Sequence, residues 1–389
     1  MAHSPSPQPL IGEEDVVPLL QMLIRVPSVG LIHGEKGIAD AVAEYLRSHG
    51  IVVRQDEVLP GRPNVIAQLG DGPGTSLVFN AHLDTVQPGE GWTDDPYSGR
   101  LVNGKVYGRG AVDDKGPLAA MIAALVAVKA SGQALTGRLI LCAVIDEENA
   151  SEGSKALARV LHADMGVVGE ATAGDLVLAH NGSLRPRLKV AGRSAHTSRP
   201  EEGINAIEKA VPIVLAVGRL HSELRDRTHP LTGSASASVS MIRGGDQPNM
   251  IPDTCTLVLD RRMIPGESQE QALRELESFL DDLMSCDPDL RVSIDELVPT
   301  TGGPAEISAS EQVVVLLQEA IRGEYGREPR LRGMGGACDM VHMLSAGIPT
   351  AVYGPGDPSL AHKPNEHIAV GELLRGARVY ARCALQCLA

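Results

Sequence analysis

Histidine and carboxylate side chains are concentrated in five short segments of this 389-residue chain. In chain order, the segments contain His82 and Asp84, then Asp113, then Asp146 to Glu148, then Glu170, and finally His362. Imidazole and carboxylate groups without thiolate suit Zn²⁺, Mn²⁺ or Co²⁺, and a bound dication lowers the pKa of water. These residue types therefore indicate a site for divalent cations.

Each segment also has an ordinary structural explanation when it is taken alone. His82 is compatible with a hydrogen-bonded core histidine, and Asp113 with the N-cap of a helix. The acidic run at residues 146–148 is typical of a solvated loop. The metal hypothesis is favoured because the segments come at the ends of predicted strands or in the loops just after them, at one edge of one sheet.

The elements that must position these residues alternate between apolar strands and helices. Strands are expected at residues 76–81, 138–145, 165–168 and 350–353, and helices at 116–129, 154–161, 310–324 and 370–385. This alternation predicts an α/β fold with a mixed, mostly parallel sheet flanked by helices. In such a sheet, functional sites are built at the carboxyl edge of the strands.

The middle of the chain has a different order of expected strands and helices. A strand, a helix, two strands, a helix and a strand are expected at 184–190, 203–225, 235–242, 255–261, 269–284 and 291–297. That order is the split βαβ signature of a small ferredoxin-like unit. Because the alternation of strands and helices resumes afterwards, we expect residues 183–298 to form an inserted domain. The catalytic domain would then consist of residues 1–182 and 299–389.

Composition argues against several other classes of function. Aromatic residues are only 2% of the chain and the formal net charge is −14, which disfavours a nucleic-acid partner. The longest apolar stretch, residues 117–128, is too short to span a membrane. Residues 1–16 have no secretory signal pattern, and the six cysteines are scattered without a CxxC pair. We therefore expect a cytoplasmic protein with reduced thiols.

Five motifs, in this order, resemble one family of enzymes. They are His-x-Asp, Gly-Arg-Gly-x-x-Asp-Asp-Lys-Gly, Asp-Glu-Glu, Gly-Glu-x-Thr and Ala-His-x-Pro-x-Glu. The family is the acetylornithine deacetylase / succinyl-diaminopimelate desuccinylase / aminoacylase / carboxypeptidase G2 family of dizinc amidohydrolases and peptidases. The resemblance extends from about Glu14 to Leu385.

The resemblance implies a cofactor of two divalent metal ions, with Zn²⁺ favoured and Co²⁺ or Mn²⁺ as alternatives. His82, Asp113 and Glu170 would hold one ion. Asp113, Glu148 and His362 would hold the other, so that Asp113 bridges the pair. Two dications would offset the repulsion among the clustered carboxylates.

The resemblance also assigns two residues to catalysis beside the metal ions. Asp84 would orient His82, since residues i and i+2 of a strand face the same side. Glu147 would be the general base, taking a proton from a metal-bridging water and later delivering it to the leaving amine.

The inserted domain would be a lid that also forms a homodimer. By the resemblance, His196 reaches the active site across the dimer and stabilises the tetrahedral oxyanion. Asn249 and Arg262 would grip the substrate carboxylate, and Arg262 suits bidentate recognition. The backbone amide of Gly336 would face the same group.

The resulting functional hypothesis is hydrolysis of the amide bond in an N-acyl amino acid or related small derivative. One alternative is a metal-dependent dipeptidase or carboxypeptidase of the same family, and a carbamoyl-amino-acid hydrolase is disfavoured relative to both. A further alternative, from another class, is a metal-binding protein that has lost catalysis. Departures from the family pattern at Ala150, Ala171, Asn181 and Ala337-Cys338 remove no ligand and bear on substrate identity.

Overall fold

The computed structural model describes residues 11–388, which form two compact units. The first unit contains the described residues up to 178, residues 307–332 and residues from 338 onward. The second contains residues 179–306 and 333–337. The expectation that the N-terminus lacks a secretory signal falls largely on residues 1–10, outside the described residues. The domain boundaries expected from the sequence stay a prediction.

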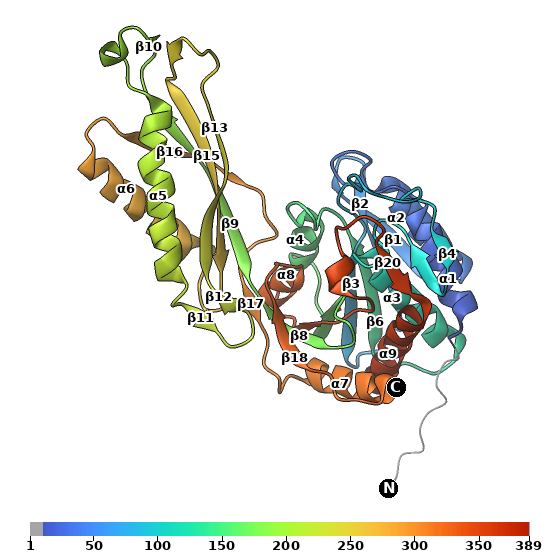
Figure 1. Ribbon diagram of the computed structural model, residues 1–389. Coiled ribbons are helices and arrows are strands. Elements are labelled where there is room, and N and C mark those ends of the chain that lie inside the picture. Colours follow the sequence, from blue (N-terminus) through green and yellow to red (C-terminus); the bar gives the residue numbers. More distant parts are fainter. Residues whose placement is uncertain (1–10, 389) are drawn as a thin grey trace. The chain divides into compact units, whose positions relative to one another are not determined.

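A mixed β-sheet is the framework of the first unit (Figure 1). The strand order is β1 (Val52–Leu59), β2 (Arg62–Leu69), β6 (Arg138–Val144), β3 (Ser76–His82), β7 (Met165–Val168), β19 (Thr350–Val352), β8 (Leu176–His180) and β17 (Ala305–Glu306), with β18 (Leu331–Met334) paired to β8. The four central strands, β6, β3, β7 and β19, are parallel. Every residue of β3 is buried, as expected for a strand covered on both faces. The predicted α/β class with a mostly parallel core is confirmed.

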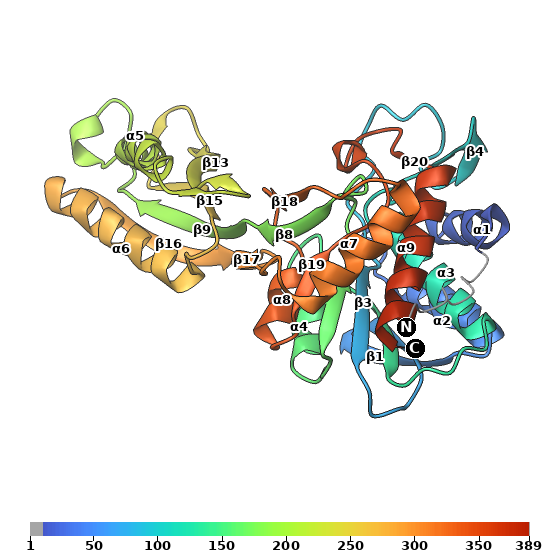
Figure 2. The ribbon, with the colours of Figure 1, turned by 90° about the horizontal axis from the view of Figure 1, so that it is seen from below.

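Helices cover both faces of this sheet (Figure 2). They are α1 (Glu13–Ile24), α2 (Lys36–Ser48), α3 (Lys115–Ala130), α4 (Glu152–Ala158), α7 (Gln312–Tyr325), α8 (Met340–Ser345) and α9 (Val370–Leu388), with a short 3₁₀ turn, η2, at Pro358–Leu360. The ring of Phe79 in β3 lies 5.1 Å from that of Tyr380 in α9. The amide of the next residue, Asn80, donates a hydrogen bond to Ser154 Oγ of α4. Because successive strand residues point to opposite faces, α9 and α4 lie on opposite sides of the sheet.

A small three-stranded sheet joins two segments that are far apart in the sequence. Its order is β20 (His367–Ala369), β5 (Lys105–Tyr107) and β4 (Arg100–Val102). The pairing of β20 with β5 brings the chain that follows His362 alongside the chain that precedes Asp113. The sequence did not predict these strands, because three residues are too few to show an alternating pattern.

The second unit has an antiparallel four-stranded sheet with two long helices. Its main elements are β9 (Gly182–Ala191), α5 (Ala206–Leu224), β13 (Ser236–Gly244), β15 (Thr254–Met263), α6 (Gln269–Cys286) and β16 (Arg291–Val298), and the sheet order is β13-β15-β9-β16. Short elements complete it: β10 (Ala195–His196), η1 (Pro200–Glu202), β11 (Thr228–His229), β12 (Gly233–Ser234) and β14 (Met250–Ile251). Asn205 and Ser268 begin the two helices, because their side chains accept hydrogen bonds from first-turn amides.

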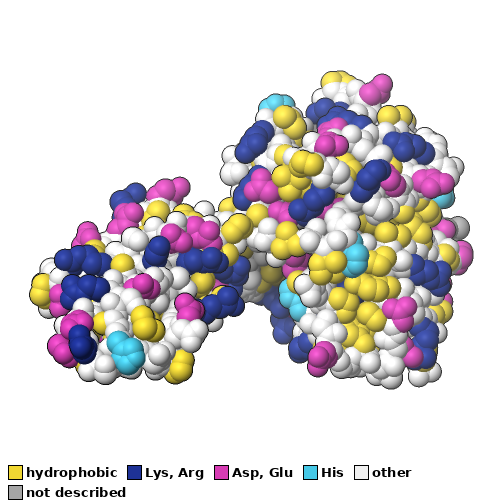
Figure 3. Space-filling view, turned by 90° about the horizontal axis from the view of Figure 1, so that it is seen from above, with side chains coloured by type: hydrophobic (Ala, Val, Ile, Leu, Met, Phe, Trp, Pro, Cys, Tyr) yellow, Lys and Arg dark blue, Asp and Glu magenta, His cyan; other side chains and the backbone are white. Residues whose placement is uncertain are grey.

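Charged groups of both signs are intermingled over the surface shown in Figure 3. The net charge of −14 is therefore not gathered into one acidic field on this face. Among residues 11–388, no helix combines the length and the hydrophobicity that crossing a membrane requires.

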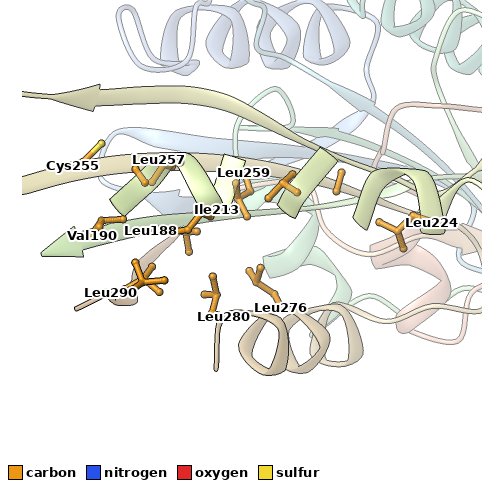
Figure 4. Close-up of a cluster of buried hydrophobic side chains, with 14 of the residues drawn as sticks. Leu188, Val190, Ile213, Leu224, Cys255, Leu257, Leu259, Leu276, Leu280 and Leu290 are labelled. Atoms are coloured by element: carbon orange, nitrogen blue, oxygen red, sulfur yellow. The ribbon is translucent and has the colours of Figure 1, made fainter. Parts of the chain in front are cut away.

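The core of the second unit is aliphatic (Figure 4). Leu188 and Leu257 from the sheet, Ile213 from α5 and Leu280 from α6 belong to one buried cluster. The cluster contains no aromatic residue among its fully buried members, in keeping with the low aromatic content of the chain. Stability of this unit therefore depends on tight packing of aliphatic side chains.

Truncating Leu257, which is fully buried, should open a cavity in this core. We expect Leu257→Ala to lower the free energy of unfolding by about 2–5 kcal/mol, measured by urea denaturation followed by circular dichroism. Leu297→Ala in β16 is the matched control, because Leu297 is 47% exposed. Equal and small effects of the two substitutions would contradict this description of the core.

Candidate metal centre

Three neighbouring parallel strands deliver acidic and imidazole groups to one edge of the main sheet. His82 is the last residue of β3, and Glu147 and Glu148 follow the end of β6 by three and four residues. Glu170 comes two residues after β7. Since β6 and β7 pair with β3 on either side, the carboxyl ends of the three strands meet at this edge.

Asp113 lies between the two predicted histidine ligands. Its Oδ1 is 3.0 Å from His82 Nε2, and its Oδ2 is 3.1 Å from His362 Nε2. Helix α3 begins two residues later, but its N-cap, Asp114, makes no side-chain capping hydrogen bond. The peptide bond between the two aspartates is cis. Since Asp114 and not Asp113 occupies the N-cap position, the ordinary explanation of Asp113 as a helix cap does not hold.

The remaining predicted ligands, Glu148 and Glu170, lie beside the two histidines. Glu148 Oε1 lies 3.0 Å from His362 Nε2, and Glu170 Oε1 lies 4.0 Å from His82 Nε2. Two sets of three residues have ligand atoms that all lie within 4.8 Å of one another: His82, Asp113 and Glu148, and His82, Asp114 and Glu170. Four of the five predicted ligands thus belong to groups that could hold a divalent cation, and Glu170 is grouped with Asp114 rather than with Asp113. The fifth, His362, lies against Asp113 and Glu148.

Asp114 is a residue of this site that the sequence analysis did not assign. It is fully buried, and its Oδ2 accepts a hydrogen bond from the backbone N–H of His82 at 3.0 Å. Within the described part of the chain, Asp114 Oδ1 has no hydrogen-bond partner. A buried carboxylate oxygen of this kind is costly unless a cation or another group satisfies it, so it fits a metal site. The adjacent pair of aspartates was the available signal, but spacing alone does not say which of them points inward.

Burial raises the pKa values of the carboxyl groups at the centre. For Glu147 and Glu170 the pKa lies well above the ordinary value, and the negative charges of Asp113 and Asp114 add to the effect at Glu170. Burial also raises the pKa of Glu148, with the charge of Asp113 as the next cause. Without cations, these groups therefore tend to hold protons, and dications would displace those protons.

The pKa values of the two histidines are raised as well, which favours their charged form. Hydrogen bonds to Asp113 and Glu148 raise the pKa of His362 to about 10. Burial lowers the pKa of His82, but hydrogen bonds to Asp113 and Asp84 outweigh it, so that the pKa lies well above its ordinary value. For Asp113, burial raises the pKa, yet the same imidazoles hold it below its usual range. The ionised Asp113 carboxylate thus favours a positive charge on each side of it. In the absence of metal the two imidazoles carry that charge, and bound cations would carry it instead.

Asp84 contacts both His82 and the loop that carries the acidic triplet. Its two carboxylate oxygens each accept a backbone hydrogen bond at 3.1 Å, one from Glu147 and one from Glu148. His82 Nδ1 lies 3.0 Å from the backbone carbonyl of Asp84 and 3.6 Å from its Oδ1. The Asp84 side chain therefore fixes the Glu147–Glu148 backbone as well as lying beside the imidazole.

A buried ion-pair network supports the same loop from its other side. Arg62 donates hydrogen bonds to Glu35 Oε2 at 2.5 Å and to Asp146 Oδ1 at 2.8 Å. The backbone N–H of Asp146 donates to Glu35 Oε1 at 3.3 Å. Glu147, which is only 7% exposed, follows directly. No motif predicted Glu35 or Arg62 as supporting residues, because both are distant from the loop in sequence.

The four predicted substrate-contacting residues lie in the second unit, whereas the metal ligands lie in the first. His196, in β10, is exposed and its Nδ1 lies 2.8 Å from Ser198 Oγ. Its strand pairs with β14, next to Asn249. Arg262 forms an ion pair with Asp260 at 2.6 Å, and Gly336 is in an exposed loop after β18. Their roles toward the substrate stay predictions.

Comparison with known proteins agrees with this chemistry. The family model for peptidase family M20/M25/M40 matches residues 78–386. The chain is 30% identical to acetylornithine deacetylase of Proteus mirabilis over 365 residues, covering 90% of this chain and 91% of that protein. It is 32% identical to a protein named LysW-lysine/LysW-ornithine hydrolase from Pyrobaculum aerophilum over 368 residues, covering 94% and 95%.

Solved structures show the same fold. The aminopeptidase PepT from Bacillus cereus superposes with a TM-score of 0.74 at 23% identity, covering 96% of this chain and 98% of that one. Because the family model covers most of the chain, the activity class follows from it as well: the protein is a metal-dependent amidohydrolase or peptidase. The chain belongs to peptidase family M20/M25/M40.

Proposed function

We propose that this protein hydrolyses the amide bond of an N-acyl amino acid or a related small amino-acid derivative. The observation that carries the proposal is the clustering of two imidazoles and several carboxylates around Asp113 and His82 at one sheet edge. Two relatives at 30% and 32% identity are named as a deacetylase of acetylornithine and a hydrolase of LysW-linked lysine or ornithine, which supports this substrate class.

Two divalent cations would be held by the residues around Asp113. His82, Asp113 and Glu170 would bind one ion, while Asp113, Glu148 and His362 would bind the other. Zn²⁺ is favoured, with Co²⁺ or Mn²⁺ as alternatives, because the ligands are imidazole nitrogens and carboxylate oxygens. When bound, the ions lower the pKa of water and polarise the substrate carbonyl.

Glu147 is the proposed general base. Its burial and raised pKa suit a group that takes a proton from the attacking water and then protonates the departing nitrogen. The water oxygen forms a bond to the acyl carbon, the C–N bond breaks, and the products are a carboxylate and an amine. Asp84 holds the backbone of Glu147, so the base is supported on a fixed loop.

The second unit is proposed to act as a lid over the substrate and as a dimerisation domain. His196 would stabilise the oxyanion across the dimer, and Asn249 and Arg262 would bind the substrate carboxylate together with the backbone amide of Gly336. The Nε of Arg262 donates a hydrogen bond to Asp260 Oδ1 at 2.6 Å, which anchors the guanidinium group.

An exposed apolar stripe supports dimerisation through this unit. Ile207, Val211 and Leu215 follow one another at four-residue spacing on α5 and are 38%, 48% and 61% exposed. Strand β13 forms one edge of the sheet and carries Met241 and Ile242, which are 44% and 50% exposed. An apolar helix face packed against an edge strand is the kind of surface that a second copy of the chain would cover.

A cytoplasmic location is proposed as well. All six cysteines are free thiols in the structure, and four of them are buried. Free thiols persist in a reducing compartment.

Replacing the proposed base should greatly slow turnover but leave the metal content unchanged. We expect Glu147→Gln to lower kcat by about 10²- to 10⁴-fold, because proton transfer is lost while the ligands are intact. Metal content, measured by mass spectrometry, should equal that of the wild type. Glu152→Gln, at the start of α4 and with a side chain that is 39% exposed, is the control. A variant that keeps a tenth of the wild-type kcat would refute the role of Glu147.

The substrate class is tested by activity profiling of the metal-loaded protein. We expect kcat/KM for N-acyl amino acids, including acetylornithine, to exceed that for a panel of dipeptides by at least about tenfold, a difference of ~1.4 kcal/mol. The reverse order would indicate the dipeptidase or carboxypeptidase alternative. Two bound metal equivalents without hydrolysis of either class would indicate a catalytically silent metal-binding protein.

A charge placed in the α5 stripe should prevent dimerisation. We expect Leu215→Glu to give a monomer in size-exclusion chromatography with light scattering, whereas the wild type gives a dimer, because a buried carboxylate without a partner is strongly unfavourable. Val160→Glu is the control, since Val160 is 64% exposed and lies in the first unit. Dimeric Leu215→Glu protein would place the interface elsewhere.

A further inference from the structure

Glu366 is a buried carboxylate that belongs to neither proposed ligand set. It lies four residues after His362, immediately before β20, and is fully buried. Its Oε1 accepts hydrogen bonds from the backbone N–H groups of Val112 at 2.7 Å and Asp113 at 3.1 Å. Its Oε2 accepts a third backbone hydrogen bond, from Gly110 at 3.2 Å.

A buried arginine balances the charge of this carboxylate. Arg109 Nη1 donates to Glu366 Oε2 at 2.5 Å, and its Nη2 donates to the carbonyl of Pro88 at 3.0 Å. The guanidinium group also lies over the ring of Trp92, 5.4 Å from its centre. The four groups that hydrogen-bond to the Glu366 side chain are all N–H donors, and they oppose the rise in its pKa that burial causes.

Glu366 thereby connects the two loops that supply His362 and Asp113. The backbone is joined at the same place, because the N–H of Gly108 donates to the carbonyl of Glu366 at 2.9 Å. Gly110 adopts a φ of +87°, a left-handed conformation that favours glycine and lets three N–H groups turn toward one carboxylate. The side chain of Asp113 points the other way, toward His82 and His362.

We propose that Glu366 is a positioning residue that fixes the backbone of Asp113 relative to His362. It would thereby set the affinity for the second cation, the one assigned to Asp113, Glu148 and His362. This inference rests on the proposed dinuclear function. It goes beyond a structural role, because an ion pair that merely joined two loops would change stability without changing metal affinity. Groups behind a ligand commonly change metal affinity about 10- to 100-fold when they are removed.

The test is a cobalt titration of protein from which metal has been stripped. Glu366→Gln keeps the shape of the side chain but turns an NH₂ group toward N–H donors, so the loop must move. We expect the wild type to bind two equivalents of Co²⁺, read from its visible absorption, and the variant to bind the second equivalent about 10- to 100-fold more weakly. If Glu366→Gln does not fold, Glu366→Asp serves as the second variant. It keeps the charge beside Arg109 but has a shorter side chain, and it should also weaken binding of the second equivalent of Co²⁺.

Glu324→Gln is the matched control. Glu324 pairs with Arg382 at 2.7 Å between α7 and α9 and is only 10% exposed, so the substitution also removes a mostly buried charge. It should lower the melting temperature without changing cobalt binding. Two tight equivalents in a folded Glu366 variant would overturn the positioning role. Failure of the wild type to bind two equivalents would instead refute the proposed dinuclear function.

Discussion

Repulsion among buried carboxylates is the constraint on which the first unit depends. Five acidic side chains occupy one edge of its sheet: Asp113, Asp114, Glu147, Glu148 and Glu170. In a low-dielectric interior such charges cannot all be ionised together unless positive charge is supplied. The imidazoles of His82 and His362 supply part of it from either side of Asp113. Binding of divalent cations would supply the rest and would allow every ligand to lose its proton.

The site is held mainly through the backbone of its loops. Asp84 accepts the N–H groups of Glu147 and Glu148, and Glu366 accepts those of Val112 and Asp113. Neither Asp84 nor Glu366 is an assigned metal ligand. Each carboxylate instead fixes the backbone of a residue that is one, Glu148 or Asp113. Because a hydrogen bond to the peptide leaves the ligand side chain free to face inward, the loop can be rigid while its carboxylate contacts the imidazoles.

The long elements and the short apolar strands β7 and β19 were predictable, whereas several other short strands were not. The helix expected at residues 116–129 is α3, and the apolar run at 138–145 is β6, because a dozen helical positions or a continuous buried run gives a clear pattern. Strands β5 and β20 were missed, since each has three residues and exists only by pairing with the other. Strand β8 was also missed, although all five of its residues are apolar or buried.

The sequence alone determined the chemistry of the site. It specifies which residues carry carboxylate or imidazole groups, and it places them after strands whose ends lie at the same edge of the sheet. The tertiary structure decided what spacing does not encode. It turned Asp114 inward beside His82 and brought Glu366 under the loop of Asp113. It also joined Arg62 to Asp146 across 84 positions of chain. The reason is physical: a motif fixes the order of residues along the chain, but the direction of each side chain depends on the backbone of a folded loop. Partners distant in sequence complete that loop.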